Sequence, residues 1–422
     1  MPNAKLVHHN ATQFKKGVVK LAPGLYTAVG YAASTQHMVV GKASVTIIDT
    51  SESTAAAANV LAEFRKITDK PIARIIYTHS HRDHISGAAV FAEGQDVAIY
   101  AHHGFASDLV AQDQAAIAPY KSLGRRTMAQ FGIGLSAEQR ISLGCGPGDR
   151  PMEGLGAGFM PPTVMIEQGQ SLDLDGVQVE LIFAPGETAD HMALWFPENG
   201  VLIPGDNWYH AFPNLYAIRG TPYRDFQAWA DTLAMLERLG ADVMAPGHTQ
   251  PVFGVAAISQ VLSTTRAAIL HVMRHTADGM DAGLPLDDIA ATMQLPPEIA
   301  DMPWLGEFYG KASWSARAFA SGMLGWYDGN PTHLGTLSSK GRAEHIVKLA
   351  GGVDALWAAT KDSTEWQWRL ELCDHLLALG EDARLLKAEA MEALAEDEIN
   401  ATARNAYLWE ANQLRIASET PL

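Results

Sequence analysis

Apolar and polar residues alternate with a short period in the first part of the chain. Residues 25–29 and 43–49 are rich in β-branched and aromatic side chains and are bounded by glycine and polar residues, which predicts two strands. Residues 53–66 place apolar side chains at helical spacing, and residues 73–78 form a short apolar segment typical of a buried strand. This order of strand, helix and strand favours an α/β sandwich.

The same pattern continues through the next part of the chain. Residues 177–184 alternate as a strand does, residues 225–239 have the pattern of an amphipathic helix, and residues 241–244 are strand-like. Residues 132–162 are rich in glycine, which indicates a loop. A loop of this length inside a compact domain is usually functional or mobile.

The remainder of the chain is helical in pattern and rich in Leu, Ala, Glu and Arg. The segments with apolar residues at helical spacing are residues 256–277, 286–293, 312–324, 341–360, 363–379, 381–396 and 398–417. Short connections between the last helices indicate helical hairpins, although no clear repeat period is present. We therefore predict two domains, an α/β domain over residues 1–255 and an all-α domain over residues 256–422.

Composition is that of a globular protein with an acidic surface. The chain has 422 residues, of which 47% are hydrophobic, and a formal net charge of -16 that disfavours nucleic acid as a partner. No apolar run approaches the roughly 20 residues of a membrane helix. The N-terminus lacks the apolar stretch of a secretory signal, so we expect a cytoplasmic protein that does not bind membranes. Cys145 and Cys373 lie far apart in sequence and are expected to be buried thiols.

A group of potential metal ligands follows the predicted strand at residues 73–78. His79 and His81 are separated by one residue, so in an extended chain their imidazoles point the same way and can bind one ion at about 2.0–2.1 Å. Asp83 and His84 follow where the chain turns into a helix, so they leave in another direction and can hold a second ion. The ions of such two-metal sites lie roughly 3.5–4 Å apart.

Three further ligands are expected where an apolar strand gives way to a loop. The candidates are His191, Asp206 and His248, of which the last two each follow a Pro-Gly pair. Asp206 is assigned as the bridge between the metals because a carboxylate has two oxygens. The remaining assignment gives one metal His79, His81 and His191, and the other metal Asp83, His84 and His248. The alternative, scattered surface or core histidines, fits the ordered spacing of the motif less well.

These ligands predict a binuclear, metal-dependent hydrolase. Zinc is the first expectation for a site with many histidines and few carboxylates, with iron or manganese as alternatives. A metal pair of this kind lowers the pKa of a bound water to about 7 and presents hydroxide to an electrophile. We expect Asp83 and Asp206 to be catalytic, Asp83 as a ligand that also orients the nucleophile. The sequence identifies no general acid for the leaving group.

Residues 78–84, Thr-His-Ser-His-Arg-Asp-His, resemble the signature of the metallo-β-lactamase superfamily. Other segments are similar more narrowly to the class III alkylsulfatases, which are zinc-dependent alkyl sulfate hydrolases. These segments are residues 62–71, 143–162, 214–220, 224–225, 304–310, 325–331 and 404–408. Together they span nearly the whole chain.

The resemblance implies an αββα metallo-β-lactamase sandwich followed by an all-α dimerisation domain that interlocks two subunits, and hence a homodimer. Family members usually also have a C-terminal lipid-carrier-like domain and often a secretion signal, and this sequence shows neither. The family usually has glutamates as the third ligand and the bridge, where this chain has His191 and Asp206. An imidazole in place of a carboxylate would make the site one unit less negative and the metals stronger Lewis acids.

The substrate contacts are predicted from the segment after Asp206. Arg219 is the first candidate, because a guanidinium binds an oxyanion with two hydrogen bonds and because the position resembles the sulfate-contacting region of the family. Asn214 and Tyr216 lie beside it in sequence and can donate, and His210 is a further candidate. The alternatives are a structural ion pair for Arg219 and an ordinary loop histidine at His210.

The leading functional prediction is hydrolysis of a small anionic alkyl sulfate ester to an alcohol and sulfate. The alternative is another ester-like substrate on the same scaffold, namely a lactone, β-lactam, thioester or phosphoester. A third possibility is a non-catalytic helical assembly module with a vestigial metal domain, and the complete set of ligands argues against it. The sequence does not say whether the C–O or the S–O bond is cleaved.

Overall fold

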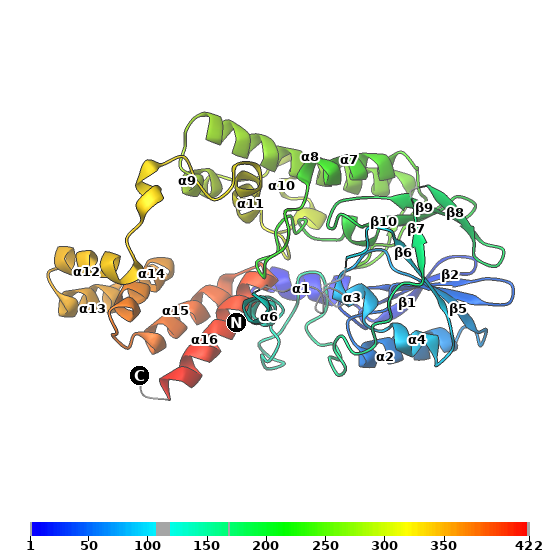
Figure 1. Ribbon diagram of the computed structural model, residues 1–422, viewed down its shortest axis with the longest axis horizontal. Coiled ribbons are helices and arrows are strands. Elements are labelled where there is room, and N and C mark those ends of the chain that lie inside the picture. The colour runs from blue at the N-terminus through cyan, green and yellow to red at the C-terminus, as the bar shows by residue number, and fades with distance from the viewer. Residues whose placement is uncertain (1, 107–118, 168, 420–422) are drawn as a thin grey trace.

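Two mixed sheets form the first part of the computed structural model, which describes residues 2–106, 119–167 and 169–419 (Figure 1). The first sheet has seven strands in sequence order, with antiparallel pairs from β1 to β4 and parallel pairs from β4 to β7. Strands β1 to β7 are Gly17–Ala22, Leu25–Val29, Gln36–Val40, Val45–Ile48, Ile72–Ile76, Ala98–His102 and Val164–Ile166.

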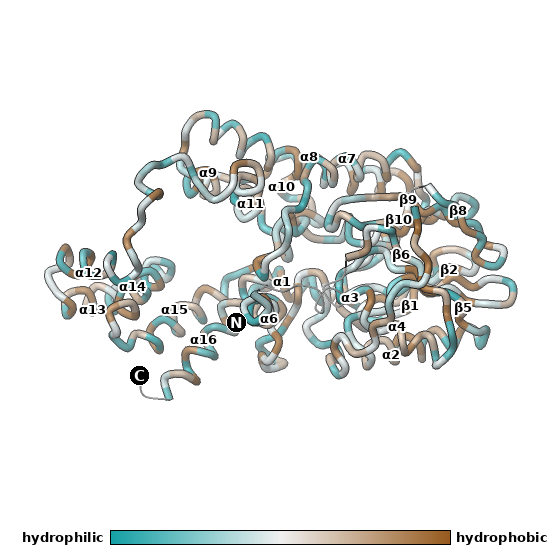
Figure 2. Tube along the Cα trace, viewed as in Figure 1, coloured by the Kyte–Doolittle hydropathy of each residue, from teal (hydrophilic) through white to brown (hydrophobic). Residues whose placement is uncertain are grey.

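The second sheet has six strands in the order β13-β12-β11-β10-β9-β8. Its neighbours pair antiparallel except β11 and β12, which are parallel. Strands β8 to β13 are Gln170–Asp173, Gln178–Phe183, Met192–Phe196, Val201–Ile203, Val243–Met244 and Val252–Phe253. Apolar residues of both sheets, such as Ile48 and Ile76 from the first and Leu194 from the second, form one buried cluster between them. Several strands accordingly show stretches of hydrophobic colouring in Figure 2.

Helices cover the outer face of each sheet. On the first sheet lie α2 (Thr54–Arg65) and α4 (Ala88–Ala92), and on the second lie α7 (Phe226–Glu237) and α8 (Val255–Asp281). Ser53 and Asp225 begin α2 and α7 as N-caps, accepting hydrogen bonds from free backbone N–H groups of the first turn. The result is the αββα sandwich that the family resemblance implied.

Among the described residues, α8 alone is long and apolar enough to cross a membrane by length and composition. Its buried residues, including Leu262 and Ile269, belong to the core cluster that α7 and the second sheet form. The apolar face of α8 is therefore explained by packing inside the protein.

The second part of the chain is helical, as predicted. It contains α9 (Leu286–Ala291), α10 (Pro297–Ala300), α11 (Ala312–Leu324), α12 (Ser339–Ala350), α13 (Val353–Asp362), α14 (Trp366–Ala378), α15 (Arg384–Asp397) and α16 (Ala401–Ser418). The single helix predicted over residues 341–360 is wrong, because α12 and α13 are separate. Gly351 and Gly352 have φ of +94° and +125°, a backbone conformation that ends a helix and that glycine adopts readily.

Two helices that the sequence did not predict join the two parts of the chain. The first, α1 (Ala4–Gln13), places Leu6 in a buried cluster with Tyr309 and Ala401 from the helical part. The other, α6 (Tyr120–Gln130), packs against α16, where Leu135 and Leu408 share a small core. The predicted domain boundary near residue 255 coincides with the start of α8, but it remains a prediction, since α8 packs on the sandwich.

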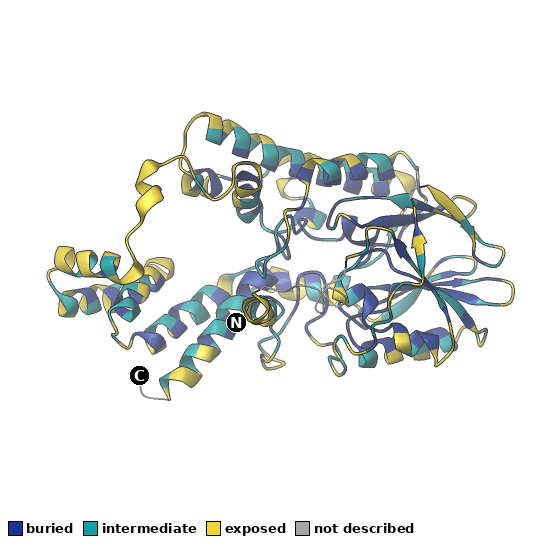
Figure 3. Cartoon of the chain, in the orientation of Figure 1, coloured by how far each residue is buried: buried dark blue, intermediate teal, exposed yellow. Residues whose placement is uncertain are grey.

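The connection between α11 and α12 differs from the rest of the molecule in its exposure. Residues 321–340 are exposed except Tyr327, and they lie along the outside of the molecule at the upper left of Figure 3. The segment contains large apolar side chains, among them Trp326 at 76% exposure and Leu324 at 69%. Helices α12 to α14 lie beyond it, at a distance from the sandwich (Figure 1).

Candidate metal centre and active site

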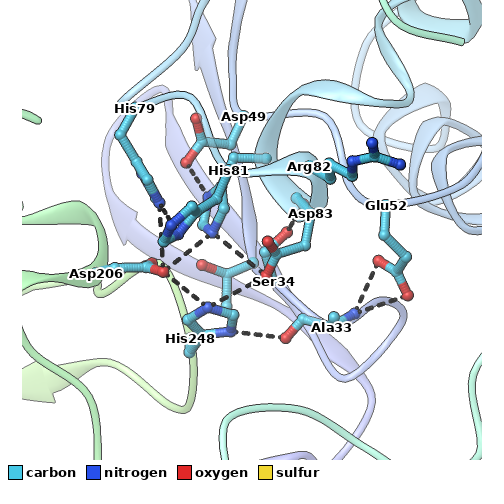
Figure 4. A network of polar contacts seen from close by, with 12 residues as sticks. Ala33, Ser34, Asp49, Glu52, His79, His81, Arg82, Asp83, Asp206 and His248 are labelled. Atoms are coloured by element: carbon cyan, nitrogen blue, oxygen red, sulfur yellow. Dashed lines mark hydrogen bonds and ion pairs between the residues drawn. The ribbon is translucent and has the colours of Figure 1, made fainter. Parts of the chain in front are cut away.

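The predicted ligands come together where strands of both sheets end. Strand β5 leads into the segment 79–84, in which α3 (Arg82–Ile85) begins. In the second sheet, Asp206 follows β11 and His248 follows β12, each directly after a Pro-Gly pair. Figure 4 shows His79, His81, Asp83, Asp206 and His248 directed toward one another. The tertiary structure thus joins side chains that lie up to 169 residues apart in sequence, from 79 to 248.

Glycines before these side chains permit the close approach of the strand ends. A Cβ atom on Gly247 would lie 2.2 Å from Oδ1 of Asp206, and one on Gly205 would lie 2.3 Å from Cε1 of His191. Any larger residue would therefore push the ligand segments apart, because a hydrogen is the only side chain that fits. The Pro-Gly pairs are part of the site's construction.

The first group of ligand atoms contains His79, His81 and Asp206. Nε2 of His79 lies 3.0 Å from Nδ1 of His81 and 3.5 Å from Oδ2 of Asp206. Ligands that surround one ion tetrahedrally at about 2.0–2.2 Å stand about 3.3–3.6 Å from one another. The spacing therefore fits a single ion.

The second group contains Asp83, His84 and His248. Oδ2 of Asp83 lies 3.6 Å from Nε2 of His84 and 3.5 Å from Nε2 of His248. Oδ2 of Asp206 lies 3.3 Å and 3.0 Å from the same two nitrogens. Oδ2 of Asp206 thus lies between the two groups, and its predicted role as a bridge stays a prediction.

Hydrogen bonds on the far side of each ring leave the inner nitrogens of three histidines available. Nδ1 of His84 lies 2.7 Å from the Asp49 carboxylate, and Nδ1 of His248 donates over 2.8 Å to the carbonyl of Ala33. Nδ1 of His79 lies 2.9 Å from Oγ1 of Thr78. Among the described residues, Nε2 of His84 and Oδ1 of Asp206 are buried without a hydrogen-bond partner. Buried polar atoms of this kind indicate a missing ligand, and the donor set fits a divalent metal.

The protonation of the site follows from burial and from the carboxylates. Burial lowers the pKa of His79 and His81 well below the usual range, with the guanidinium of Arg219 contributing at His81. Although burial opposes the shift, Asp206 raises the pKa of His248 to about 9. Without a metal, a proton on His248 neutralises part of the buried negative charge, and a metal ion would compete with that proton.

The structure does not support the predicted ligand role of His191. Its ring stacks on His79 with centroids 4.6 Å apart, but its Nε2 accepts a hydrogen bond of 3.0 Å from the backbone N–H of Asp206. Its Nδ1 lies 3.3 Å from the side-chain amide nitrogen of Asn207. A ring nitrogen that accepts a hydrogen bond has no free lone pair for a metal. His191 is therefore placed to support the His79 ring.

Glu187, which the sequence analysis missed, lies where His191 was expected. Its Oε1 is 3.9 Å from Nδ1 of His81, and its Oε2 is buried without a hydrogen-bond partner among the described residues. Burial raises the pKa of Glu187 to about 7, although the guanidinium of Arg224 at 2.8 Å opposes the shift. The signal that would have found it is the pair Pro185-Gly186 before it, the same pattern that precedes Asp206 and His248. With this carboxylate at the site, the expected loss of one negative charge does not follow.

The predicted substrate contacts lie on one loop, in different surroundings. Arg219 is close enough to His81 to lower the pKa of that ring, and its backbone N–H donates to the side chain of Gln130. Asn214 is buried, and its side-chain nitrogen has no partner among the described residues. Tyr216 is half-buried on the same loop. His210 packs edge-on against Trp208, and its carbonyl accepts from His9, so it matches the ordinary loop histidine given as the alternative.

Two family models match the chain in agreement with this architecture. Residues 30–248 match the metallo-beta-lactamase superfamily, and residues 286–416 match the alkyl sulfatase dimerisation family. The first match covers β3 to β12 of the sandwich and the candidate metal ligands up to His248, and the second covers most of the helical part.

Similar proteins are alkylsulfatases. A linear primary-alkylsulfatase of a Pseudomonas species is 34% identical over 89% of this chain and 73% of its own length. An alkyl/aryl-sulfatase of Saccharomyces cerevisiae is 31% identical over 94% of this chain, which spans 64% of that protein. The solved structure of a stereoselective inverting sec-alkylsulfatase from a Pseudomonas species superposes with a TM-score of 0.87 at 28% identity, covering 98% of this chain and 68% of the other. The chain therefore belongs to the alkylsulfatase family within the metallo-beta-lactamase superfamily.

Proposed function

We propose that this chain is a metal-dependent alkylsulfatase that hydrolyses an alkyl sulfate to an alcohol and sulfate. The observation that carries the proposal is the pair of ligand groups that share Oδ2 of Asp206. Its relatives over nearly the whole chain are named for hydrolysis of primary, secondary or aryl sulfate esters. The chain spans about two thirds of the length of these relatives, so the activity of the whole protein is assigned here by proposal.

The proposed site holds two divalent ions, with zinc as the first candidate and iron or manganese as alternatives. His79, His81, Glu187 and Asp206 would hold the first, and Asp83, His84, His248 and Asp206 the second. Imidazole and carboxylate ligands in four-coordinate groups favour zinc. When bound, a metal pair supplies Lewis acidity and lowers the pKa of water, which is the nucleophile that ester hydrolysis needs.

The residues of the chain itself would bind and orient the sulfate group. Arg219 brings a fixed positive charge to the His81 side of the site, where its guanidinium can form paired hydrogen bonds with sulfate oxygens. Asn214 adds an unpartnered side-chain donor on the same loop. Asp83, whose side chain is 30% exposed, is the ligand most open to solvent in the second group and is suited to orient the attacking water.

The protein is proposed to work as a homodimer. The helical part matches the family model for alkyl sulfatase dimerisation, and it exposes large apolar side chains on the 321–340 segment and on α12. Leu349 on α12, at 85% exposure, adds to the apolar side chains that this part of the molecule exposes. A second copy of the chain would cover this surface.

The activity is tested with a panel of substrates on the purified, metal-loaded chain. Dodecyl sulfate, a secondary alkyl sulfate, a lactone, nitrocefin and a phosphodiester separate the sulfatase proposal from the other hydrolases of this fold. We expect release of inorganic sulfate, lost after chelation and restored by added zinc. If none of the alkyl sulfates is cleaved while another ester is, the proposed substrate class is wrong.

The role of Arg219 is tested by Arg219→Ala. Loss of a charged hydrogen bond of about 1.5–3 kcal/mol should lower kcat/KM for an alkyl sulfate by roughly 10- to 100-fold. Metal content should stay that of the wild type, since no ligand is altered. The matched control is Arg125→Ala, which removes an exposed guanidinium paired with Glu410 and should leave kcat/KM unchanged. An unchanged kcat/KM in Arg219→Ala would show that this guanidinium does not bind the substrate.

A further inference from the structure

A buried ion pair lies next to the second ligand group without belonging to it. Nε of Arg150 donates to Oε1 of Glu52 over 2.9 Å, and the two side chains are 4% and 6% exposed. Burying two charges costs several kcal/mol per ion, and their attraction offsets this only in part unless further hydrogen bonds are made. The other hydrogen bonds of Glu52 therefore indicate which part of the structure this ion pair stabilises.

Glu52 holds the peptide of Ala33. Both carboxylate oxygens accept from the backbone N–H of Ala33, at 3.1 Å and 3.0 Å. The carbonyl of the same residue accepts from Nδ1 of His248 over 2.8 Å, as Figure 4 shows. A carbonyl can only accept, so this contact fixes the proton on Nδ1 and directs Nε2 toward Asp206 and Asp83. One continuous line of polar contacts thus runs from Arg150 to a metal ligand.

Loop residues 33–35 contact the second group at two more places. The Ser34 hydroxyl donates to the backbone carbonyl of Asp83, and the Thr35 N–H donates over 2.7 Å to the carbonyl of Gly247. The hydrogen bonds described for this loop do not reach His79 or His81. Whatever fixes the loop therefore acts on the second ligand group.

The glycine-rich segment fixes the loop from the outside. A Cβ atom on Gly146 would lie 2.6 Å from the carbonyl oxygen of Ala33, so the segment packs directly on the peptide that His248 contacts. The N–H of Gly156 donates over 3.1 Å to the carbonyl of Glu52, and Arg150 belongs to the same segment. The glycine-rich loop predicted over residues 132–162 thus carries one half of the ion pair.

We propose that Glu52 and Arg150 are positioning residues for the second metal group, which hold His248 at binding distance through the peptide of Ala33. The inference rests on the proposed metal centre and adds two residues that bind neither metal nor substrate. Loss of an outer hydrogen-bond partner of a metal ligand typically lowers metal affinity about 10- to 100-fold.

The test measures the binding of zinc alone to the metal-free chain, in competition with a chelator of known affinity. Wild type should bind two ions, and His248→Ala identifies which binding step belongs to the second group. Glu52→Gln keeps an acceptor for Ala33 but removes the charge that pairs with Arg150. We expect the dissociation constant of the second step to rise about 10- to 100-fold and that of the first step to stay unchanged.

A milder variant and a matched control accompany this test. Arg150→Lys keeps the positive charge and loses the Nε contact, so the same step should weaken by a smaller factor. Lys311→Met breaks another partly buried ion pair, between the start of α11 and Glu398 at the end of α15, and should lower thermal stability without changing either zinc constant. With cobalt(II) in place of zinc, the visible spectrum of the second site should change in Glu52→Gln and not in Lys311→Met.

Two results for the variants would overturn the proposal. One is wild-type zinc affinity in both Glu52→Gln and Arg150→Lys. The other is an equal weakening of both binding steps, which indicates general loosening of the fold. The readout is independent of sulfate release, so a chain that shows the unequal loss but cleaves no alkyl sulfate would refute the proposed activity and retain the positioning role. A wild-type chain that binds no second ion would refute both.

Discussion

Glu187 and His191 lie four residues apart, and either side chain is a candidate for the third position of the first ligand group. His191 is held by its backbone, whose carbonyl accepts from Ala184 N–H just before β10 begins. Nε2 of the His191 ring accepts a hydrogen bond from the backbone N–H of Asp206. Glu187 lies on the turn before it, free of the ladder, and its carboxylate reaches His81 and Arg224. Local backbone constraint, more than residue type, decides which of the two faces the candidate metal centre.

This difference predicts unequal effects of two substitutions by glutamine. Glu187→Gln replaces a charged oxygen by a neutral amide and should weaken the first zinc step by at least about 10-fold, because a ligand is lost. His191→Gln should change zinc affinity by a smaller factor, since it alters only the support of His79. Chelator competition on metal-free protein measures both. The reverse order of the two effects would restore His191 as the ligand.

At the scale of elements, the site depends on how strands end. Three strands of the second sheet are followed by a Pro-Gly pair and then by Glu187, Asp206 or His248. Proline terminates the strand because it cannot donate to the ladder, and glycine lets the next segment approach closely. The ligands are thus carried by short turns on rigid strands, which keeps their spacing fixed.

Gly247→Ala tests this requirement. The added Cβ would lie 2.2 Å from Oδ1 of Asp206 and 2.9 Å from the backbone of Gly205, so the bridging carboxylate or the turn must move. We expect both zinc steps to weaken at least about 10-fold, since Asp206 serves both groups. Gly124→Ala, in α6 where nothing lies within 4 Å, is the matched control and should bind zinc as wild type does. Normal zinc binding by Gly247→Ala would contradict the bridging role of Asp206.

Helix α1 carries a pH-dependent contact at a distance from the metals. His9 stacks on Phe308 with centroids 4.0 Å apart and contacts the carbonyl of His210. Burial lowers the pKa of His9 to about 4. The unfolded chain binds a proton at His9 near pH 6.5, whereas the folded chain binds it only near pH 4. The free energy of unfolding therefore decreases as the pH is lowered from about 6.5 to about 4.

His9→Phe should retain the stack and remove this titration. Between pH 7 and pH 5, protonation of His9 in the unfolded chain should lower the unfolding free energy of the wild type by about 2 kcal/mol. The variant lacks this contribution, so its unfolding free energy should decrease by about 2 kcal/mol less over the same range. At pH 7 the variant should be less stable by roughly 1 kcal/mol, because the hydrogen bond to His210 is gone. Urea unfolding at the two pH values measures both differences. Parallel pH dependence of the two proteins would show that His9 is not buried in the neutral form.

At the scale of the whole molecule, the first helices of the helical part share a core with the sandwich, and the last ones contact α1 and α6, yet much apolar surface stays uncovered. Helices α1 and α6 anchor α15 and α16, whereas α12 to α14 lie away from the sandwich (Figure 1). The exposed side chains include Trp326, Leu334 and Leu349, at 76%, 63% and 85%. Covering such residues releases roughly 25 cal/mol per Å² of apolar surface, which favours association with a second copy.

The proposed homodimer predicts that Trp326→Ser together with Leu349→Asp weakens association without harming the metal site. We expect the dissociation constant of the dimer to rise by at least about 100-fold, since two large side chains leave the interface. Sedimentation at several protein concentrations measures the shift, and zinc stoichiometry of two per chain serves as the control. A wild-type chain that sediments as a monomer at micromolar concentration would remove the proposal.

The elements predicted most closely from pattern were those with clear periodic segments. The helices over residues 53–66 and 312–324 and the strand over 25–29 agree with α2, α11 and β2 within one or two residues. The break between α12 and α13 was missed because the apolar period continues across Gly351 and Gly352. Helix α1 was missed because its stability comes from contacts with distant residues such as Phe308.

The amino-acid sequence by itself determined the fold class and six of the side chains that converge, because strand and helix periods are local and the spacing of His79, His81, Asp83 and His84 fixes their directions along one segment. The tertiary structure decided which side chains lie close together and which of their polar atoms are buried. It placed Glu187 instead of His191 beside His81, joined Arg150 to His248 through Ala33, and left Asp206 between both groups. These choices depend on which strand ends meet and which ring nitrogens are already hydrogen-bonded, and neither property is local in sequence.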